Sequence, residues 1–199
     1  MANSRKNMLY RGRKQEVREP RQRFLICCEG KKTEPQYFEK FKVSAEVIVC
    51  GEGAVTSSLV QRAIEKSKAE NYDQVWCVFD RDSNSKKSFT DALALAEKNG
   101  FKVAYSVQAF EIWYLLHFNY HDTSLSRKDY CKKLTEYLGC KYEKRDDAIY
   151  EKLLSKQPQA IKWAKKLFNS YKRSANPHDN DPSTTVHLLV EELDKFSRK

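Results

Sequence analysis

The chain alternates between short, wholly apolar runs and segments whose apolar residues recur at helical spacing. The apolar runs cover Phe24 to Cys28, Val47 to Cys50, Val75 to Phe79 and Val103 to Tyr105. Runs with no polar face are typical of strands that are buried on both sides of a sheet. We therefore expect four such strands in the first half of the chain.

The intervals between these runs carry helical patterns. Thr33 offers an N-cap with Gln36 three residues later, as in a capping box, and Thr56 can cap the next helix. A third helix is expected from about Ser88 to Asn99, with Gly100 as its C′ residue. Strands that alternate with helices in this way predict βαβ units with right-handed crossovers, and therefore one parallel sheet.

After Ser106 the pattern becomes helical. Phe110 to Phe118 is nearly all apolar and predicts a buried helix, and Ser126 with Asp129 can open another. Further helices fit residues 146–154 and 159–171, and a last one follows Pro182. The expected organisation is an N-terminal arm (1–22), an α/β core (23–106) and a helical extension packed on that core (107–199).

Acidic residues follow two of the predicted strands. Glu29 comes directly after the first strand, and Asp80 and Asp82 follow the third. In a parallel α/β sheet the carboxyl ends of all strands meet at the edge that carries the binding crevice. Neighbouring strands are about 4.8 Å apart, so these carboxylates converge if the two strands are adjacent. Mg²⁺ prefers such oxygen ligands and commonly bridges them to phosphates, which predicts a Mg²⁺ or Mn²⁺ site formed by Glu29, Asp80 and Asp82.

Charge favours a polyanionic partner for this edge. The chain has a formal net charge of +10, and much of the excess lies in the first 23 residues, including Arg11, Arg13 and Lys14. This arm is either a solvated tail or a contact to phosphates. Lys31 and Lys32 follow Glu29 after a single glycine, Gly30, and in this position they are expected to neutralise phosphate charge.

The six cysteines and the polar N-terminus concern the compartment. Four cysteines lie within the predicted strands, and no CxxC pair is present, which favours free thiols in a reducing, cytoplasmic environment. Met1 to Arg23 has no apolar segment typical of a secretory signal. No apolar run approaches the length of a membrane-spanning helix.

Several of these segments together resemble a known family. Phe24 to Gly30, followed by Val78 to Asp82, is similar to the Toprim pattern of topoisomerases, primases and several nucleases. The longer strings Cys28 to Phe38, Trp76 to Asp82, Phe110 to Phe118 and Pro182 to Val186 resemble the RloB-like family. RloB-like proteins are prokaryotic, are related to Toprim proteins and are associated with restriction-modification and phage-defence loci, often beside an ATPase.

The resemblance implies a Toprim-like, Rossmann-like fold and roles for individual residues. Glu29 corresponds to the general acid or base, and Asp80 and Asp82 to the Mg²⁺ ligands. Toprim domains usually carry a glycine shortly after the second aspartate, whereas residues 83–85 here are Ser-Asn-Ser. Further catalytic candidates are Lys31 and Glu111, and the nucleic-acid contacts expected are Lys31, Lys32, Arg81, Arg11, Arg13 and Lys14.

Two classes of function fit these residues best. The first is a metal-dependent nuclease that cleaves phosphodiester bonds of RNA or DNA in phage defence, with water as the nucleophile. The second is a non-catalytic module that binds nucleic acid or a nucleotide for a partner ATPase. Nucleotidyl transfer, as in primases, is a weaker third option. The sequence leaves room for a homo-oligomer. Glu111 either serves the metal site or is a favourable charge in the first turn of a helix.

Overall fold

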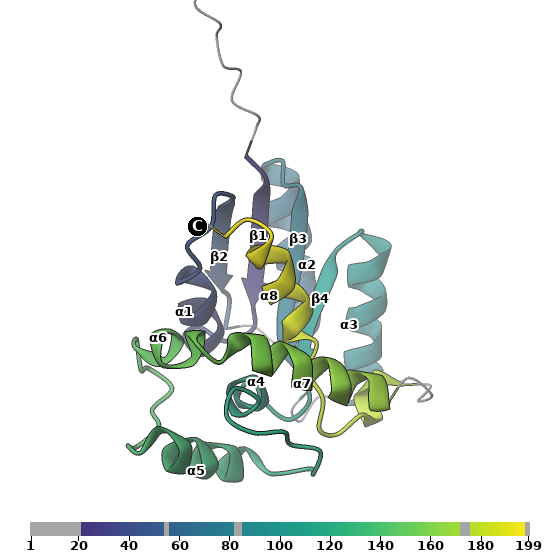
Figure 1. Ribbon diagram of the computed structural model, residues 1–199. Coiled ribbons are helices and arrows are strands. Elements are labelled where there is room, and N and C mark those ends of the chain that lie inside the picture. Colours follow the sequence, from purple (N-terminus) through teal and green to yellow (C-terminus); the bar gives the residue numbers. More distant parts are fainter. Residues whose placement is uncertain (1–20, 54–55, 82–84, 172–175, 198–199) are drawn as a thin grey trace, which may run out of the picture.

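A parallel sheet forms the centre of the computed structural model, which describes residues 21–53, 56–81, 85–171 and 176–197 (Figure 1). In this part of the chain four strands lie in the order β2-β1-β3-β4, and all neighbours are parallel. Their bounds are β1 Arg23–Cys28, β2 Glu46–Gly51, β3 Gln74–Asp80 and β4 Lys102–Ser106. The predicted α/β class is confirmed, and the first and third strands are neighbours, which is the condition for their terminal carboxylates to converge.

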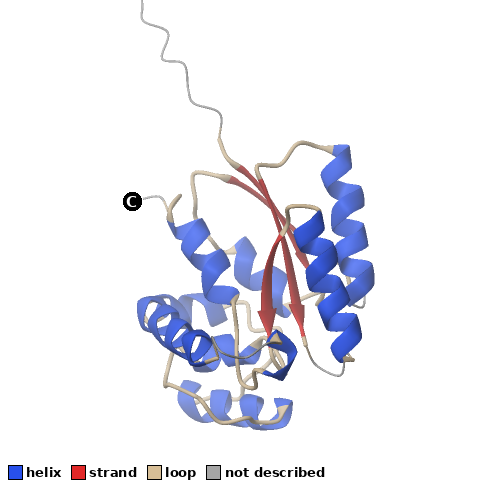
Figure 2. Ribbon diagram, turned by 90° about the vertical axis from the view of Figure 1, so that its right-hand side faces the viewer, coloured by secondary structure: helices blue, strands red, loops and turns tan. Residues whose placement is uncertain are grey.

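Helices cover both faces of the sheet because the strands bury side chains on both sides. Leu25 and Cys27 of β1 point to a cluster covered by α2 (Thr56–Ala69) and α3 (Lys86–Lys98). Phe24 and Ile26 point to the opposite cluster, which α1 (Thr33–Glu39) and α8 (Val186–Asp194) cover. Figure 2 shows the sheet nearly edge-on between these two helical layers. The result is a Rossmann-like arrangement.

The helices between β4 and α8 lie beyond the carboxyl ends of the strands (Figure 1). They are α4 (Glu111–Leu115), α5 (Arg127–Leu138), α6 (Ile149–Leu154) and α7 (Gln157–Ser170), followed by a 3₁₀ turn, η1 (Pro177–Asp179). Buried residues of α4 and α7 belong to the same apolar cluster as Phe24 and Ile26. The carboxyl edge of the sheet is therefore roofed by helices.

The segment before α8 forms hydrogen bonds along the outer edge of β4. Thr185 donates its backbone N–H to the carbonyl of Tyr105 at 2.9 Å, and Val107 donates to the carbonyl of Ser183 at 2.8 Å. Thr184 forms an isolated antiparallel bridge with Ser106. These bonds satisfy backbone groups that an edge strand otherwise presents to solvent.

The local helix signals had mixed outcomes. Ser126 and Asp129 form a complete capping box at the start of α5, and Gly100 follows α3 with a φ of 70°. The predicted cap at Thr33 is wrong, because Lys32 holds the N-cap position and no side chain caps α1. Thr33 is instead the first helical residue, and its hydroxyl faces the Lys144 carbonyl at 3.5 Å. A tertiary contact has replaced the local one.

The expected helix over residues 110–118 is shorter than predicted. Its α-helical part is limited to α4, and the chain continues to Phe118 in turns. No helix within the described ranges is both long enough and apolar enough to cross a membrane.

Candidate functional site

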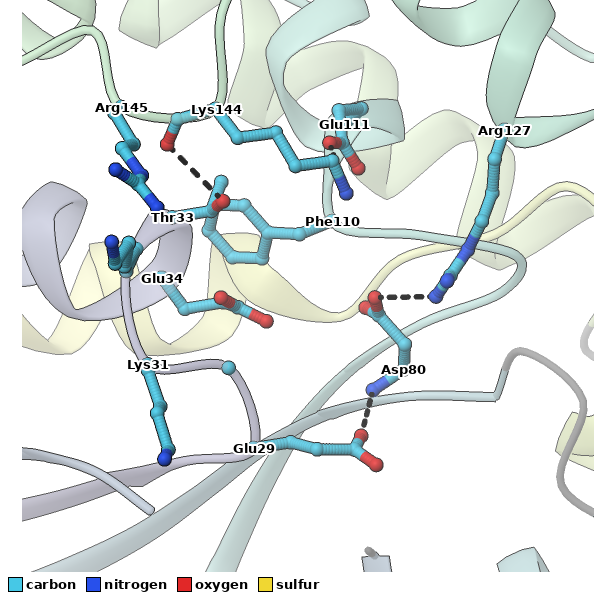
Figure 3. Close-up of a pocket in the computed structure, with 12 residues that line it drawn as sticks. Glu29, Lys31, Thr33, Glu34, Asp80, Phe110, Glu111, Arg127, Lys144 and Arg145 are labelled. Atoms are coloured by element: carbon cyan, nitrogen blue, oxygen red, sulfur yellow. Dashed lines mark hydrogen bonds and ion pairs between the residues drawn. The ribbon is translucent and has the colours of Figure 1, made fainter. Parts of the chain in front are cut away.

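A cavity of about 490 Å³ opens at the carboxyl edge of the sheet, between the strand ends and the helices that roof them. Of the described residues, four carboxylates and five cations line it, together with Gly30, Thr33 and Phe110. The carboxylates are Glu29, Glu34, Asp80 and Glu111, and the cations are Lys31, Lys32, Arg127, Lys144 and Arg145. Figure 3 shows them arranged around one space.

Adjacent strands bring Glu29 and Asp80 together. Glu29 follows β1, and Asp80 is the last residue of β3, its neighbour in the sheet. Glu29 Oε2 accepts a hydrogen bond from the Asp80 backbone N–H at 3.0 Å, and Glu29 Oε1 accepts one from the Thr56 hydroxyl at 3.2 Å. The third predicted metal ligand, Asp82, lies outside the described residues, as do Arg11, Arg13 and Lys14.

Two further carboxylates face the same space from the helices. Glu34 in α1 is 6% exposed, and Glu111 at the start of α4 is 3% exposed. Lys144 Nζ lies 3.1 Å from Glu111 Oε1, and the Tyr142 hydroxyl donates to the same oxygen at 3.4 Å. In the close-up, the side chains of Glu34, Asp80 and Glu111 converge from three sides (Figure 3).

A glycine makes room for one of these carboxylates. A Cβ atom on Gly30 would lie 2.2 Å from Glu34 Oε2, so the carboxylate packs directly on the glycine backbone. Any larger residue at this position would displace the Glu34 side chain. The Glu-Gly sequence after β1 thus serves the cavity twice, through the Glu29 carboxylate and through the missing side chain of Gly30.

The crowding of carboxylates shifts their protonation. Burial raises the pKa of Asp80 well above its usual value, and the charges of Glu34, Glu111 and Glu29 add to this, while Arg127 opposes it. Burial also raises the pKa of Glu34, with further contributions from Glu111 and Glu29. Such repulsion is relieved by a cation, and the donor set consists only of oxygens, which is the chemistry that Mg²⁺ and Mn²⁺ prefer.

The carboxylates are not drawn together as a closed ligand cage. Among the described residues, no group of three or more His, Cys, Asp or Glu side chains is arranged to hold a metal ion. Asp80 Oδ2 instead lies 3.3 Å from Arg127 Nη2, and Glu111 is bonded to Lys144. The donors fit a divalent cation in kind, and protein cations occupy two of them in this arrangement.

Lysines on the β1–α1 loop form one rim of the cavity. Lys31 and Lys32 are exposed and line it beside Glu29. The stem of Lys31 lies against Gly53, whose φ is 56°, and a Cβ atom there would approach Lys31 Cε to 2.1 Å. Gly51 has the same function for the loop backbone, because its Cβ would lie 3.0 Å from Lys31 Cα.

Arg81 has a different environment from the one expected for a phosphate ligand. Its Nη2 lies 2.9 Å from Asp181 Oδ2, and both side chains are largely buried. Gln108, which has a φ of 71°, donates its side-chain amide to the same oxygen at 2.8 Å and accepts a bond from Arg127 Nε on its carbonyl at 3.0 Å. Arg81 is therefore paired with Asp181 beside the cavity, and its contact with nucleic acid stays a prediction.

Four charged residues of the cavity were not selected from the sequence: Glu34, Arg127, Lys144 and Arg145. Glu34 lies within the segment from Cys28 to Phe38 that carries the family resemblance, but nothing in the sequence assigned it a function. Arg127 directly follows an N-cap, which gave no sign of a contact to Asp80. Nothing in the local pattern distinguishes Lys144 and Arg145 from surface cations.

Comparison with known proteins identifies the family. The model of the family described as "RloB-like protein" matches residues 24–193, which includes every described residue of the cavity. Searches of curated proteins and of solved structures found no match. Because the match covers most of the 199 residues, the chain belongs to the RloB-like protein family.

Proposed function

We propose that the protein is a Toprim-type nuclease that uses Mg²⁺ or Mn²⁺ to hydrolyse phosphodiester bonds of nucleic acid. The observation that carries this proposal is the convergence of Glu29, Glu34, Asp80 and Glu111 on one cavity rimmed by cations. The oxygens of these four carboxylates suit a divalent metal, and the cations around them suit the phosphate backbone.

The charged residues of the cavity have separate roles in this proposal. Asp80, with Asp82 and Glu29, would hold the metal, which when bound supplies polarisation of the phosphoryl oxygen and stabilises developing charge. Glu29 is fixed by the Asp80 N–H and the Thr56 hydroxyl, and from this position it accepts a proton from the attacking water. Lys31 and Lys32 neutralise the phosphate, and Glu111 orients the water or completes the ligand set.

The proposed setting is the cytoplasm of a prokaryote, in phage defence beside a partner ATPase. All six cysteines are free, which fits a reducing compartment. The locus and the ATPase follow from the family resemblance alone.

A non-catalytic binding module is the second candidate. It is favoured by the pairs Arg127–Asp80 and Lys144–Glu111, which neutralise two carboxylates without a metal. In this case the basic rim would hold a nucleic acid or nucleotide for the partner.

A cleavage assay separates the two candidates. Purified protein is incubated with mixed RNA and DNA in Mg²⁺, in Mn²⁺ and in EDTA. The test variant is Asp80→Ala, and the matched control is Asp91→Asn, an exposed carboxylate on α3 paired with Lys87. The nuclease proposal expects cleavage by wild type and the control, and none by Asp80→Ala or in EDTA.

Full cleavage by Asp80→Ala would overturn the nuclease mechanism. Binding that survives EDTA, weakens steeply with salt and shows no turnover would support the module instead.

A further inference from the structure

Two of the three cavity cations that follow α4 in the chain, Arg127 and Lys144, are paired with carboxylates of the cavity. Arg127 Nη2 lies 3.3 Å from Asp80 Oδ2, and Lys144 Nζ lies 3.1 Å from Glu111 Oε1. The carboxylate side chains are only 15% and 3% exposed, whereas those of Arg127 and Lys144 are 42% and 56% exposed. Each pair thus joins a buried carboxylate to a long side chain that is partly exposed to solvent.

Both cations are tethered near the cavity by bonds other than these pairs. Arg127 Nε donates to the backbone carbonyl of Gln108 at 3.0 Å, which holds the guanidinium beside the cavity independently of the contact between Nη2 and Asp80. The backbone at Lys144 is held to α1, because the Thr33 hydroxyl donates to its carbonyl and Gln36 donates to Asp147 at 2.8 Å. A cation released from its carboxylate therefore stays within reach of whatever occupies the cavity.

We propose that Arg127 and Lys144 are exchangeable counter-ions that bind substrate phosphate once a divalent metal has displaced them. The inference rests on the proposed function and assigns a phosphate-binding role to two residues of this chain. A metal on Asp80 or Glu111 repels a guanidinium or ammonium group at the same oxygens, because like charges at this separation interact unfavourably. A phosphodiester that binds the metal places its oxygens beside the displaced cations, which can then form charge-assisted hydrogen bonds with the phosphate.

Two consequences follow from the exchange. Arg127 and Lys144 compete with the metal, so the free protein binds the metal more weakly than its carboxylates alone would. They also assist the nucleic acid, so metal and nucleic acid each strengthen the binding of the other, as linkage requires. A cation that served only to stabilise the fold would show the competition without the assistance.

The first measurement is Mn²⁺ affinity, by titration calorimetry or by the electron spin resonance of free Mn²⁺. Arg127→Gln and Lys144→Gln should each bind Mn²⁺ on the order of tenfold more tightly than wild type. Lys128→Gln, which removes an exposed cation next to Arg127, should leave the affinity unchanged. Lys144→Arg keeps the charge and should also match wild type, and thermal melts in EDTA establish that each variant is folded.

The second measurement is the binding of a labelled single-stranded RNA or DNA oligonucleotide, with and without Ca²⁺. Wild type should bind the oligonucleotide more tightly when Ca²⁺ is present. The Arg127→Gln/Lys144→Gln double variant should lose that gain even though it binds the metal more tightly. These opposite changes in the two affinities are the signature of exchange.

Mn²⁺ affinity that is unchanged or weaker in both single variants would overturn this inference and leave the proposed function standing. A wild-type protein that binds no Mn²⁺ would overturn the proposed function and this inference together.

Discussion

Breaking the ion pair between Lys144 and Glu111 should lower the free energy of unfolding by an amount that the burial of the two side chains determines. Glu111 is 3% exposed, and its charged neighbour Lys144 is 56% exposed, with Nζ and Oε1 3.1 Å apart. Breaking a fully buried pair costs about 3–5 kcal/mol, because one charge is left without a partner. Lys144 is largely solvated and the Tyr142 hydroxyl remains on Glu111, so for Lys144→Gln we expect about 1–2 kcal/mol.

For a chain of this length that loss corresponds to a decrease in Tm of about 2–8 °C. Urea unfolding and thermal melts in EDTA measure it, with Lys141→Gln as control. Lys141 pairs with Glu143 at 3.3 Å on an exposed surface, so its loss should have no measurable effect. Adding Glu111→Gln to Lys144→Gln should recover part of the stability. A Lys144→Gln protein as stable as the control would refute the assignment of Glu111 as a charged, buried partner.

Three other changes test separate parts of the site. The pKa of Asp80 is raised in the folded protein, so the folded state binds more protons than the unfolded state from pH 3.8 up to that raised pKa. The free energy of unfolding without metal should therefore fall as pH rises through this window, and Asp80→Asn should make it less dependent on pH. Urea unfolding at several pH values measures both proteins. Equal pH dependence of the two would contradict a pKa of Asp80 raised by burial and by the neighbouring carboxylates. Gly30→Ala, which forces the Glu34 carboxylate aside, should weaken Mn²⁺ binding in calorimetry while the circular dichroism spectrum stays unchanged. Ser126→Ala removes the bonds to Asp129 and should cost about 1 kcal/mol in urea unfolding, and a cost near zero would argue against the capping box.

The strands and the acidic edge were predictable because their causes are local. An apolar run from Phe24 to Cys28 has no polar face and must be buried on both sides, which requires a sheet with helices on either side. Once the sheet is parallel, Glu29 and Asp80 lie at the same edge, and the register of β1 with β3 brings them into contact. The spacing of apolar residues and the positions of the strand ends were therefore enough to find Glu29 and Asp80, two of the four carboxylates that line the cavity.

The cations that complete the cavity were not predictable, because tertiary packing places them. Arg127 follows Asp80 by 47 residues, and Lys144 approaches Thr33 across 111 residues of sequence. Their positions depend on how α5 packs against α4 and on how the loop after α5 docks on α1, which no local pattern encodes. The failure at Thr33 has the same origin, since its hydroxyl serves this docking and not the helix end.

The proposed function requires that the cavity binds a divalent metal through the strand-end carboxylates. The most direct test is a crystal structure of the protein with Mn²⁺, examined by anomalous scattering. We expect a peak within about 2.0–2.3 Å of a carboxylate oxygen of Asp80, close to Glu29, with Arg127 moved away from Asp80. An empty cavity at saturating Mn²⁺, with Arg127 still 3.3 Å from Asp80, would contradict it.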